Sequence, residues 1–177
     1  MITVIVPTHN DEEPLAHMLP PLVTHAVTGT VSQLIVHDGG STDGTARVAD
    51  VAGADFKSSK TPLADVLDTV RAPWLLVLPP GAVLEGNWEH VVTEHLNSAR
   101  GPRTLACFNV LPDRSRALWK RVLFPKTKPK TPLANGLLVA TSTARQSLKG
   151  RTTAKLEDVA TGRAIMRLRA GISFRWA

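Results

Sequence analysis

Short apolar runs alternate with amphipathic segments along the first half of the chain. Residues 2–6, 33–37 and 74–78 are almost continuously apolar, which is typical of parallel strands buried on both faces. Between the last two of these runs, residues 62–71 carry apolar side chains at helical spacing. This alternation predicts an α/β fold with a mostly parallel central sheet and helices on both faces.

Cap and breaker residues set the limits of the other expected elements. A helix should begin near Asp11 and be interrupted or ended at Pro20-Pro21. Asn87 should cap a helix that ends near residue 98. The remaining expectations are helices at 43–52, 115–123 and 153–169, strands at 54–57, 104–110, 137–140 and 172–176, and a loop at 124–135.

Length and composition indicate an ordinary globular protein. The chain has 177 residues, of which 43% are hydrophobic and 20% charged, so we expect a single domain. The single cysteine, Cys107, cannot form an internal disulfide, and neither a membrane-spanning run nor a signal peptide is recognisable. We therefore expect a cytoplasmic protein.

Charge is distributed unevenly along the chain. Residues 1–99 contain 4 Lys and Arg against 12 Asp and Glu, whereas residues 100–177 contain 17 against 3. The basic half indicates either an anionic partner, such as a phosphorylated substrate or an anionic membrane surface contacted peripherally, or merely a solvated basic face. A nucleic-acid-binding module is a weaker alternative, because aromatic residues make up only 5% of the chain and the acidic half would repel phosphates.

Polar, glycine-containing loops follow the first two expected strands. Ligands of open parallel sheets bind beyond the carboxyl ends of the strands, where these loops should converge. Glycine permits positive φ and close approach of the backbone to a ligand. The alternative is a tight strand–helix turn in which Ser41 and Asp43 are only caps. The candidate nucleotide-binding residues are Pro7, Thr8, Asn10, Asp38, Gly39, Gly40 and Asp43.

These loops carry a family resemblance. ProThrHisAsn at 7–10, followed by HisAspGlyGlySerThrAspGlyThr at 37–45, resembles the opening of family 2 glycosyltransferases, which have the GT-A fold. The short soluble bacterial members are the most similar. ProTrpLeuLeuValLeu at 73–78 and LysLeuGluAspValAla at 155–160 extend the likeness over nearly the whole chain.

The resemblance implies transfer of a sugar from a nucleotide-diphosphate donor to the hydroxyl of an unknown acceptor. On this resemblance, residues 1–99 form the nucleotide-binding half of the domain and residues 100–177 the acceptor-side half. Thr8, Asn10 and Asp38 would line the pocket for the base and ribose. Asp158, with Glu157 beside it, matches the carboxylate that removes the acceptor hydroxyl proton as general base. The alternative is that these two acids only favour the start of a helix.

One departure from the family concerns the metal site. Family members carry an Asp-x-Asp motif that binds Mg²⁺ or Mn²⁺. This motif aligns with Pro79-Pro80-Gly81, whose side chains cannot ligate a cation. Lysine or arginine side chains would then neutralise the diphosphate, or transfer has been lost and the protein is an inactive nucleotide-sugar binder. The candidate cations are Lys126, Lys128 and Lys130, with Arg145 and Arg151 as further possibilities.

Overall fold

The computed structural model describes residues 1–98, 104–111, 131–149 and 155–174. The helix expected at 115–123 and the first part of the loop expected at 124–135 lie outside these ranges. So do Lys126, Lys128, Lys130 and Arg151. Within the described ranges, no helix is long and apolar enough to cross a membrane.

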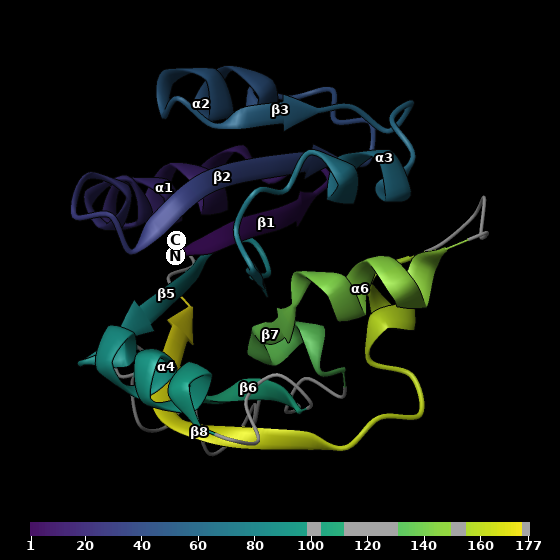
Figure 1. Ribbon diagram of the computed structural model, residues 1–177. Coiled ribbons are helices and arrows are strands. Elements are labelled where there is room, and N and C mark those ends of the chain that lie inside the picture. The colour runs from purple at the N-terminus through teal and green to yellow at the C-terminus, as the bar shows by residue number, and fades with distance from the viewer. Residues whose placement is uncertain (99–103, 112–130, 150–154, 175–177) are drawn as a thin grey trace, which may run out of the picture.

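The centre of the molecule is one eight-stranded sheet in the order β3-β2-β1-β4-β7-β6-β8-β5 (Figure 1). β1, β2, β3 and β4 are mutually parallel where they pair, as the sequence predicts. β7 runs antiparallel to both β4 and β6, while β8 is parallel to β6 and antiparallel to β5. The strands are Ile2–Thr8, Val31–Asp38, Asp55–Lys57, Trp74–Val77, Ala82–Glu85, Leu105–Val110, Leu137–Ala140 and Ile165–Phe174 for β1 to β8.

Helices cover both faces of the sheet, as an α/β sequence requires. Alternate side chains of β1 point to opposite faces, so Val4 and Val6 enter one core and Ile5 the other. The first core includes side chains of α1 (Glu12–Val27), α2 (Thr45–Val51) and α4 (Trp88–Asn97). The second includes side chains of α3 (Leu63–Asp68), α6 (Thr141–Leu148) and the 3₁₀ turns η2 (Leu133–Asn135) and η3 (Leu156–Val159).

The prediction that Pro20-Pro21 interrupts the first helix is wrong. α1 continues through both prolines to Val27. Both are exposed, while a buried stripe runs on through Leu19 and Leu22. Packing of that stripe against the first core stabilises the helix despite the backbone hydrogen bonds that proline cannot donate.

The helix predicted at 153–169 is also wrong. Among its described residues, 155–169, the only helical element is the short turn η3, and Gly162, at φ 70°, precedes the ten-residue strand β8. Leu168, Ala170 and Ile172 are buried at a period of two, which is the pattern of a strand. Strand β5 and helix α6 are not among the sequence predictions. The Asn87 prediction is right in position, since α4 begins after it, but its side chain makes no capping hydrogen bond.

Candidate functional site

Thr8 and Asp38 are neighbours at the carboxyl ends of β1 and β2. They pair in register, and the Thr8 hydroxyl donates to the Asp38 carboxylate over 3.4 Å. The backbone N–H of Gly39 donates to the Thr8 carbonyl at 2.7 Å, so the second loop begins against the end of β1. The two loops therefore converge, as the sequence predicts.

The Asp38 carboxylate points into its own loop. One oxygen accepts hydrogen bonds from the backbone N–H groups of Gly40 and Ser41, both at 2.9 Å, and the other accepts from the Ser41 hydroxyl. Burial alone would raise the pKa of Asp38, but the hydrogen bonds from Ser41, Gly40 and Thr8 outweigh it and hold the pKa below its usual value. Asp38 is thus buried and ionised, and its hydrogen bonds fix the conformation of the 39–44 loop.

Asn10 links the first loop to the second. Its side-chain carbonyl accepts a hydrogen bond from the Thr42 backbone N–H at 2.8 Å. The backbone N–H of Asn10 donates to the Ser41 hydroxyl, also at 2.8 Å. Asn10 adopts φ 56°, in the left-handed region that few residues other than glycine enter. Its side-chain amide nitrogen lies 3.5 Å from a His9 ring nitrogen.

Asp43 and Glu12 form reciprocal hydrogen bonds between the two loops. Together with the contacts of Asn10, these hydrogen bonds are called the lock between the loops. Asp43 accepts hydrogen bonds from the backbone N–H groups of Glu12, at 3.1 Å, and Thr45, at 3.0 Å. The Thr45 hydroxyl also donates to Asp43, and together these bonds hold the pKa of Asp43 below its usual value. Glu12 accepts from the Gly44 N–H at 2.9 Å and pairs with Arg47 at 3.2 Å. Every acid of this lock is therefore satisfied within the protein.

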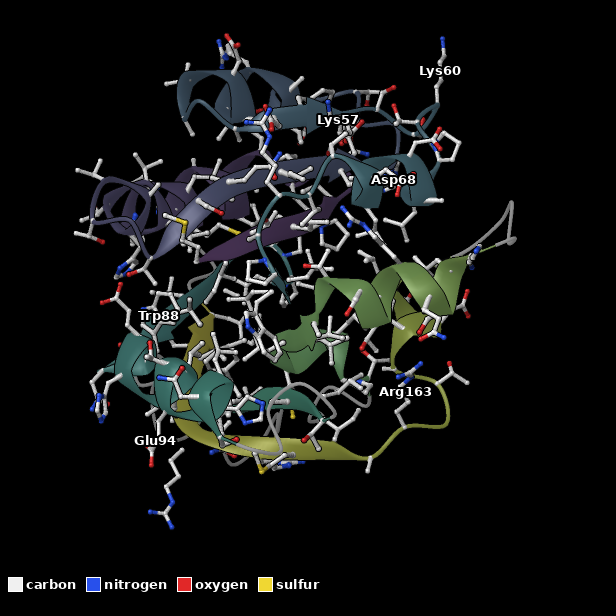
Figure 2. The ribbon with its side chains drawn as sticks, viewed as in Figure 1. Lys57, Lys60, Asp68, Trp88, Glu94 and Arg163 are labelled. Atoms are coloured by element: carbon white, nitrogen blue, oxygen red, sulfur yellow. The ribbon has the colours of Figure 1, made fainter. Side chains whose placement is uncertain are left out.

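Two glycines keep the backbone of the second loop accessible. Gly40 has φ 99°, which other residues rarely adopt, and a Cβ there would lie 3.7 Å from the Ser59 hydroxyl. A Cβ on Gly39 would lie 3.1 Å from the Thr8 carbonyl oxygen. In Figure 2, Lys57 lies at the end of β3, and the Lys60 side chain extends outward from the segment that follows. The glycines present backbone groups that a planar or anionic ligand can approach closely.

Pro79, Pro80 and Gly81 form a tight turn between β4 and β5. The Ala82 N–H donates to the Pro79 carbonyl at 3.2 Å and Gly81 has φ 75°, the pattern of a type II turn. None of the three side chains offers an oxygen ligand, and the described ranges contain no group of three His, Cys, Asp or Glu able to hold a metal ion. These residues do not fit the Mg²⁺ or Mn²⁺ that the family resemblance implies.

Glu157 and Asp158 lie on η3, away from the locked loops. η3 packs beside α6 in the second core, whereas the loops join β1 and β2 to α1 and α2. Asp158 is half-buried and accepts a hydrogen bond from the Lys155 N–H at 3.0 Å, while Glu157 is exposed. Asp158 therefore caps the start of η3, and its role as general base stays a prediction.

Arg145 is not a free cation for phosphate. Its guanidinium donates to the backbone carbonyls of Leu67 at 3.0 and 3.1 Å and of Val70 at 2.7 Å. It also lies 3.8 Å from the Asp68 carboxylate, which Figure 2 shows on α3 near α6. Arg145 therefore stabilises the carboxyl end of α3, which corrects its assignment as a candidate phosphate ligand.

Sequence reasoning missed Glu12, Ser41 and Thr42 as members of the site. For Ser41 and Thr42 the signal is the run of short polar residues at 41–45, which are residue types that hydrogen-bond nearby backbone groups. Glu12 lies outside this run. Although the loops are expected to meet, the individual hydrogen bonds between them do not follow from the sequence, because their residues lie about thirty positions apart.

Comparison with known proteins shows the fold. No protein-family model matches the sequence, and no curated protein does. Among solved structures, the chain is similar to glucosyl-3-phosphoglycerate synthase from Mycobacterium tuberculosis with Mg²⁺ and UDP, at 20% identity and a TM-score of 0.67. It is also similar to the complexes of that enzyme with Mn²⁺, UDP and glucosyl-3-phosphoglycerate (19%, 0.65) and with Mn²⁺ and UDP-glucose (20%, 0.61). Each match covers 100% of this chain and 72% of the other. The chain therefore has the GT-A fold of nucleotide-diphospho-sugar transferases.

Proposed function

We propose that this protein transfers a sugar from a nucleotide-diphosphate donor to an acceptor hydroxyl. The observation that carries the proposal is the lock between the β1 and β2 loops, at the carboxyl edge where open parallel sheets bind nucleotides. The GT-A fold supports it, because the similar synthase structures hold UDP or UDP-glucose.

In this proposal the base and ribose lie against the backbone of Pro7, Thr8, Gly39 and Gly40. Asn10 contributes its side-chain amide nitrogen, a hydrogen-bond donor that lies 3.5 Å from a His9 ring nitrogen. Asp38 acts indirectly, because its oxygens already accept hydrogen bonds from its own loop. It positions Gly39 and Gly40 instead of contacting the base. Asp43 does the same at the start of α2.

Asp158, with Glu157 beside it, is the proposed general base. A carboxylate that takes the acceptor proton as the anomeric carbon is attacked contributes typically 10²–10⁴-fold to the rate. Asp158→Asn tests this role cleanly, because the amide oxygen can still accept the Lys155 N–H and preserve η3. We expect kcat to fall by about 10²-fold or more with donor affinity unchanged, and Glu157→Gln to have a smaller effect.

Charge on the leaving diphosphate would be met by lysine side chains, for which Lys126, Lys128 and Lys130 remain the sequence-based candidates. Turnover should then persist in EDTA and be lost in the triple Lys→Ala variant. A strict requirement for Mg²⁺ or Mn²⁺ would contradict this part of the proposal. Contact of the basic residues with anionic membranes also stays a prediction, which vesicle co-sedimentation tests.

An inactive nucleotide-sugar binder is the rival, favoured by the Pro79-Pro80-Gly81 turn. A thermal-shift screen with UDP-, GDP- and dTDP-sugars identifies the donor, because a ligand that binds only the folded state raises Tm. Release of nucleotide from that donor over one day then separates the two functions. Binding with release supports the enzyme, binding alone supports the rival, and no binding to any donor contradicts both.

A further inference from the structure

The second-core face of the sheet carries a continuous row of side chains across five neighbouring strands. Successive strand pairings connect its members, which are Ile5, Val77, Leu137, Cys107 and Arg167. Pro7 and Asn109 each lie two residues further along their own strands, towards the carboxyl edge. Because side chains alternate with a period of two, Pro7 and Asn109 share the next row on the same face. The loops that follow β1 and β2 therefore lie at the same edge of the sheet as Asn109.

Strand β8 is irregular where it passes Asn109. Cys107 pairs with Arg167 and Asn109 with Gly171, so β8 spans four positions where β6 spans two. Inside this bulge Leu168 and Ala170 are buried in the first core, which leaves Arg169 on the opposite face, exposed. The Asn109 side-chain amide donates to the Leu168 carbonyl at 2.7 Å. This hydrogen bond satisfies a backbone carbonyl at the position where the bulge interrupts the regular pairing. Bulges of this kind re-aim side chains beside functional sites.

Arg169 is an uncommitted cation at this position. In the ranges that the structure describes, its guanidinium has no hydrogen bond or ion pair with another residue, unlike those of Arg145 and Arg47. A guanidinium presents a planar fork of N–H donors that matches phosphate and carboxylate oxygens. Measured along the sheet, β8 lies four strand spacings, roughly 19 Å, from β1. Arg169 thus lies beside the level of Asn109, four strands across the sheet from the Thr8–Asp38 loops.

We propose that Arg169, held by the bulge that Asn109 supports, binds an oxyanion of the substrate, either a phosphate or a carboxylate. The inference deepens the proposed glycosyl transfer and rests on it for the identity of the ligand as a substrate. Two sources share this chemistry: the diphosphate of the donor and an acidic group on the acceptor. The distance from the base-binding loops favours the acceptor, which would be a hydroxyl compound that carries an acidic group.

The test compares Arg169→Gln with Arg71→Gln, which removes the same charge before β4, outside the proposed site. Binding of glycerol 3-phosphate and of UDP is measured separately by isothermal titration calorimetry on the full chain. We expect Arg169→Gln to weaken glycerol 3-phosphate by about tenfold, the effect of one lost charge-assisted hydrogen bond, and to leave UDP unchanged. Asn109→Ala, which keeps Arg169 but frees the bulge, should weaken the same ligand less.

Each outcome decides the matter. A loss for UDP instead of glycerol 3-phosphate keeps the oxyanion site and assigns it to the donor. Equal losses in Arg169→Gln and Arg71→Gln would mean general attraction by net charge and overturn the proposal, as would wild-type protein that binds neither probe. Circular dichroism of each variant checks folding. Glycerol 3-phosphate binding through Arg169 without any nucleotide-sugar binding would retain the anion site while contradicting the proposed function.

Discussion

The side-chain carbonyl of Asn10 accepts a hydrogen bond from the backbone N–H of Thr42 at 2.8 Å, while Asn10 itself is held at φ 56°. This link joins loops from two strands at the one described non-glycine residue with positive φ. Strained residues persist when their surroundings determine them fully, and they cluster at functional sites. The strained backbone of Asn10 and its hydrogen bond to Thr42 therefore act together in holding the two loops against each other.

Substitutions at Asn10 separate these two contributions. Asn10→Gly keeps access to positive φ and loses only the hydrogen bond, so we expect destabilisation of about 1 kcal/mol. Asn10→Ala loses both and should cost about 2–3 kcal/mol. Urea denaturation measures the difference. Donor affinity should fall in both variants, and equal stability of the two would contradict the role of the left-handed conformation.

Acid should weaken the protein through Asp38. Its pKa is lower in the folded state than in the unfolded chain, so the carboxylate stabilises the folded state above the unfolded pKa, about 3.9. That stabilisation is lost as the pH falls through the lowered folded pKa. We expect Asp38→Asn to destabilise the protein by about 1–3 kcal/mol at pH 7 and by progressively less below pH 4 or so.

Unfolding of wild type and Asp38→Asn across pH 2–8 checks this expectation. Asp43→Asn provides a comparison, because the Asp43 pKa is lowered in the same direction at a more exposed site. A constant difference between wild type and Asp38→Asn over the whole pH range would contradict the role of the ionised carboxylate.

Gly44 and Glu12 should be energetically coupled. A Cβ at position 44 would lie 2.3 Å from the Glu12 carboxylate, although the backbone there has an ordinary negative φ of −77°. Gly44→Ala should therefore displace the Glu12 side chain and break its hydrogen bond to the Gly44 N–H. Once Glu12→Ala has removed that side chain, the same change should cost little.

A double-mutant cycle measures this coupling. We expect an interaction energy of about 1 kcal/mol between Gly44→Ala and Glu12→Ala, within the range for residues in direct contact. Strict additivity of the two single changes would show that the lock between the loops does not involve this contact.

Arg145 should affect stability and not donor binding. Its guanidinium donates to the carbonyl of Leu67, in the last turn of α3, and to the carbonyl of Val70, just after the helix. Arg145→Met removes these charge-assisted hydrogen bonds and should destabilise the protein by about 2 kcal/mol. Arg145→Lys keeps the charge without the planar fork and should recover only part of that loss. A drop in donor affinity at unchanged stability would restore Arg145 as a phosphate ligand.

Sequence reasoning succeeded where the signal is local. The apolar runs, the turn residues and the polar loops at 7–10 and 38–45 predicted parallel strands whose loops meet, and Thr8 and Asp38 do pair. It failed where packing overrides local preference, as at Pro20-Pro21, where the buried stripe of α1 carries the helix onward. It also failed at 153–169, where burial of alternate residues on the sheet makes β8 a strand.

The sequence by itself determined the alternation of strands and helices in the first half and the concentration of hydrogen-bonding residues in two loops, because periodicity and turn chemistry act over a few neighbouring residues. Only the tertiary structure decided that β7 enters the sheet between β4 and β6, that Asp38 faces its own loop, and that Arg145 serves α3. Each of these depends on which distant segments bury their apolar faces together and which buried polar groups then need partners.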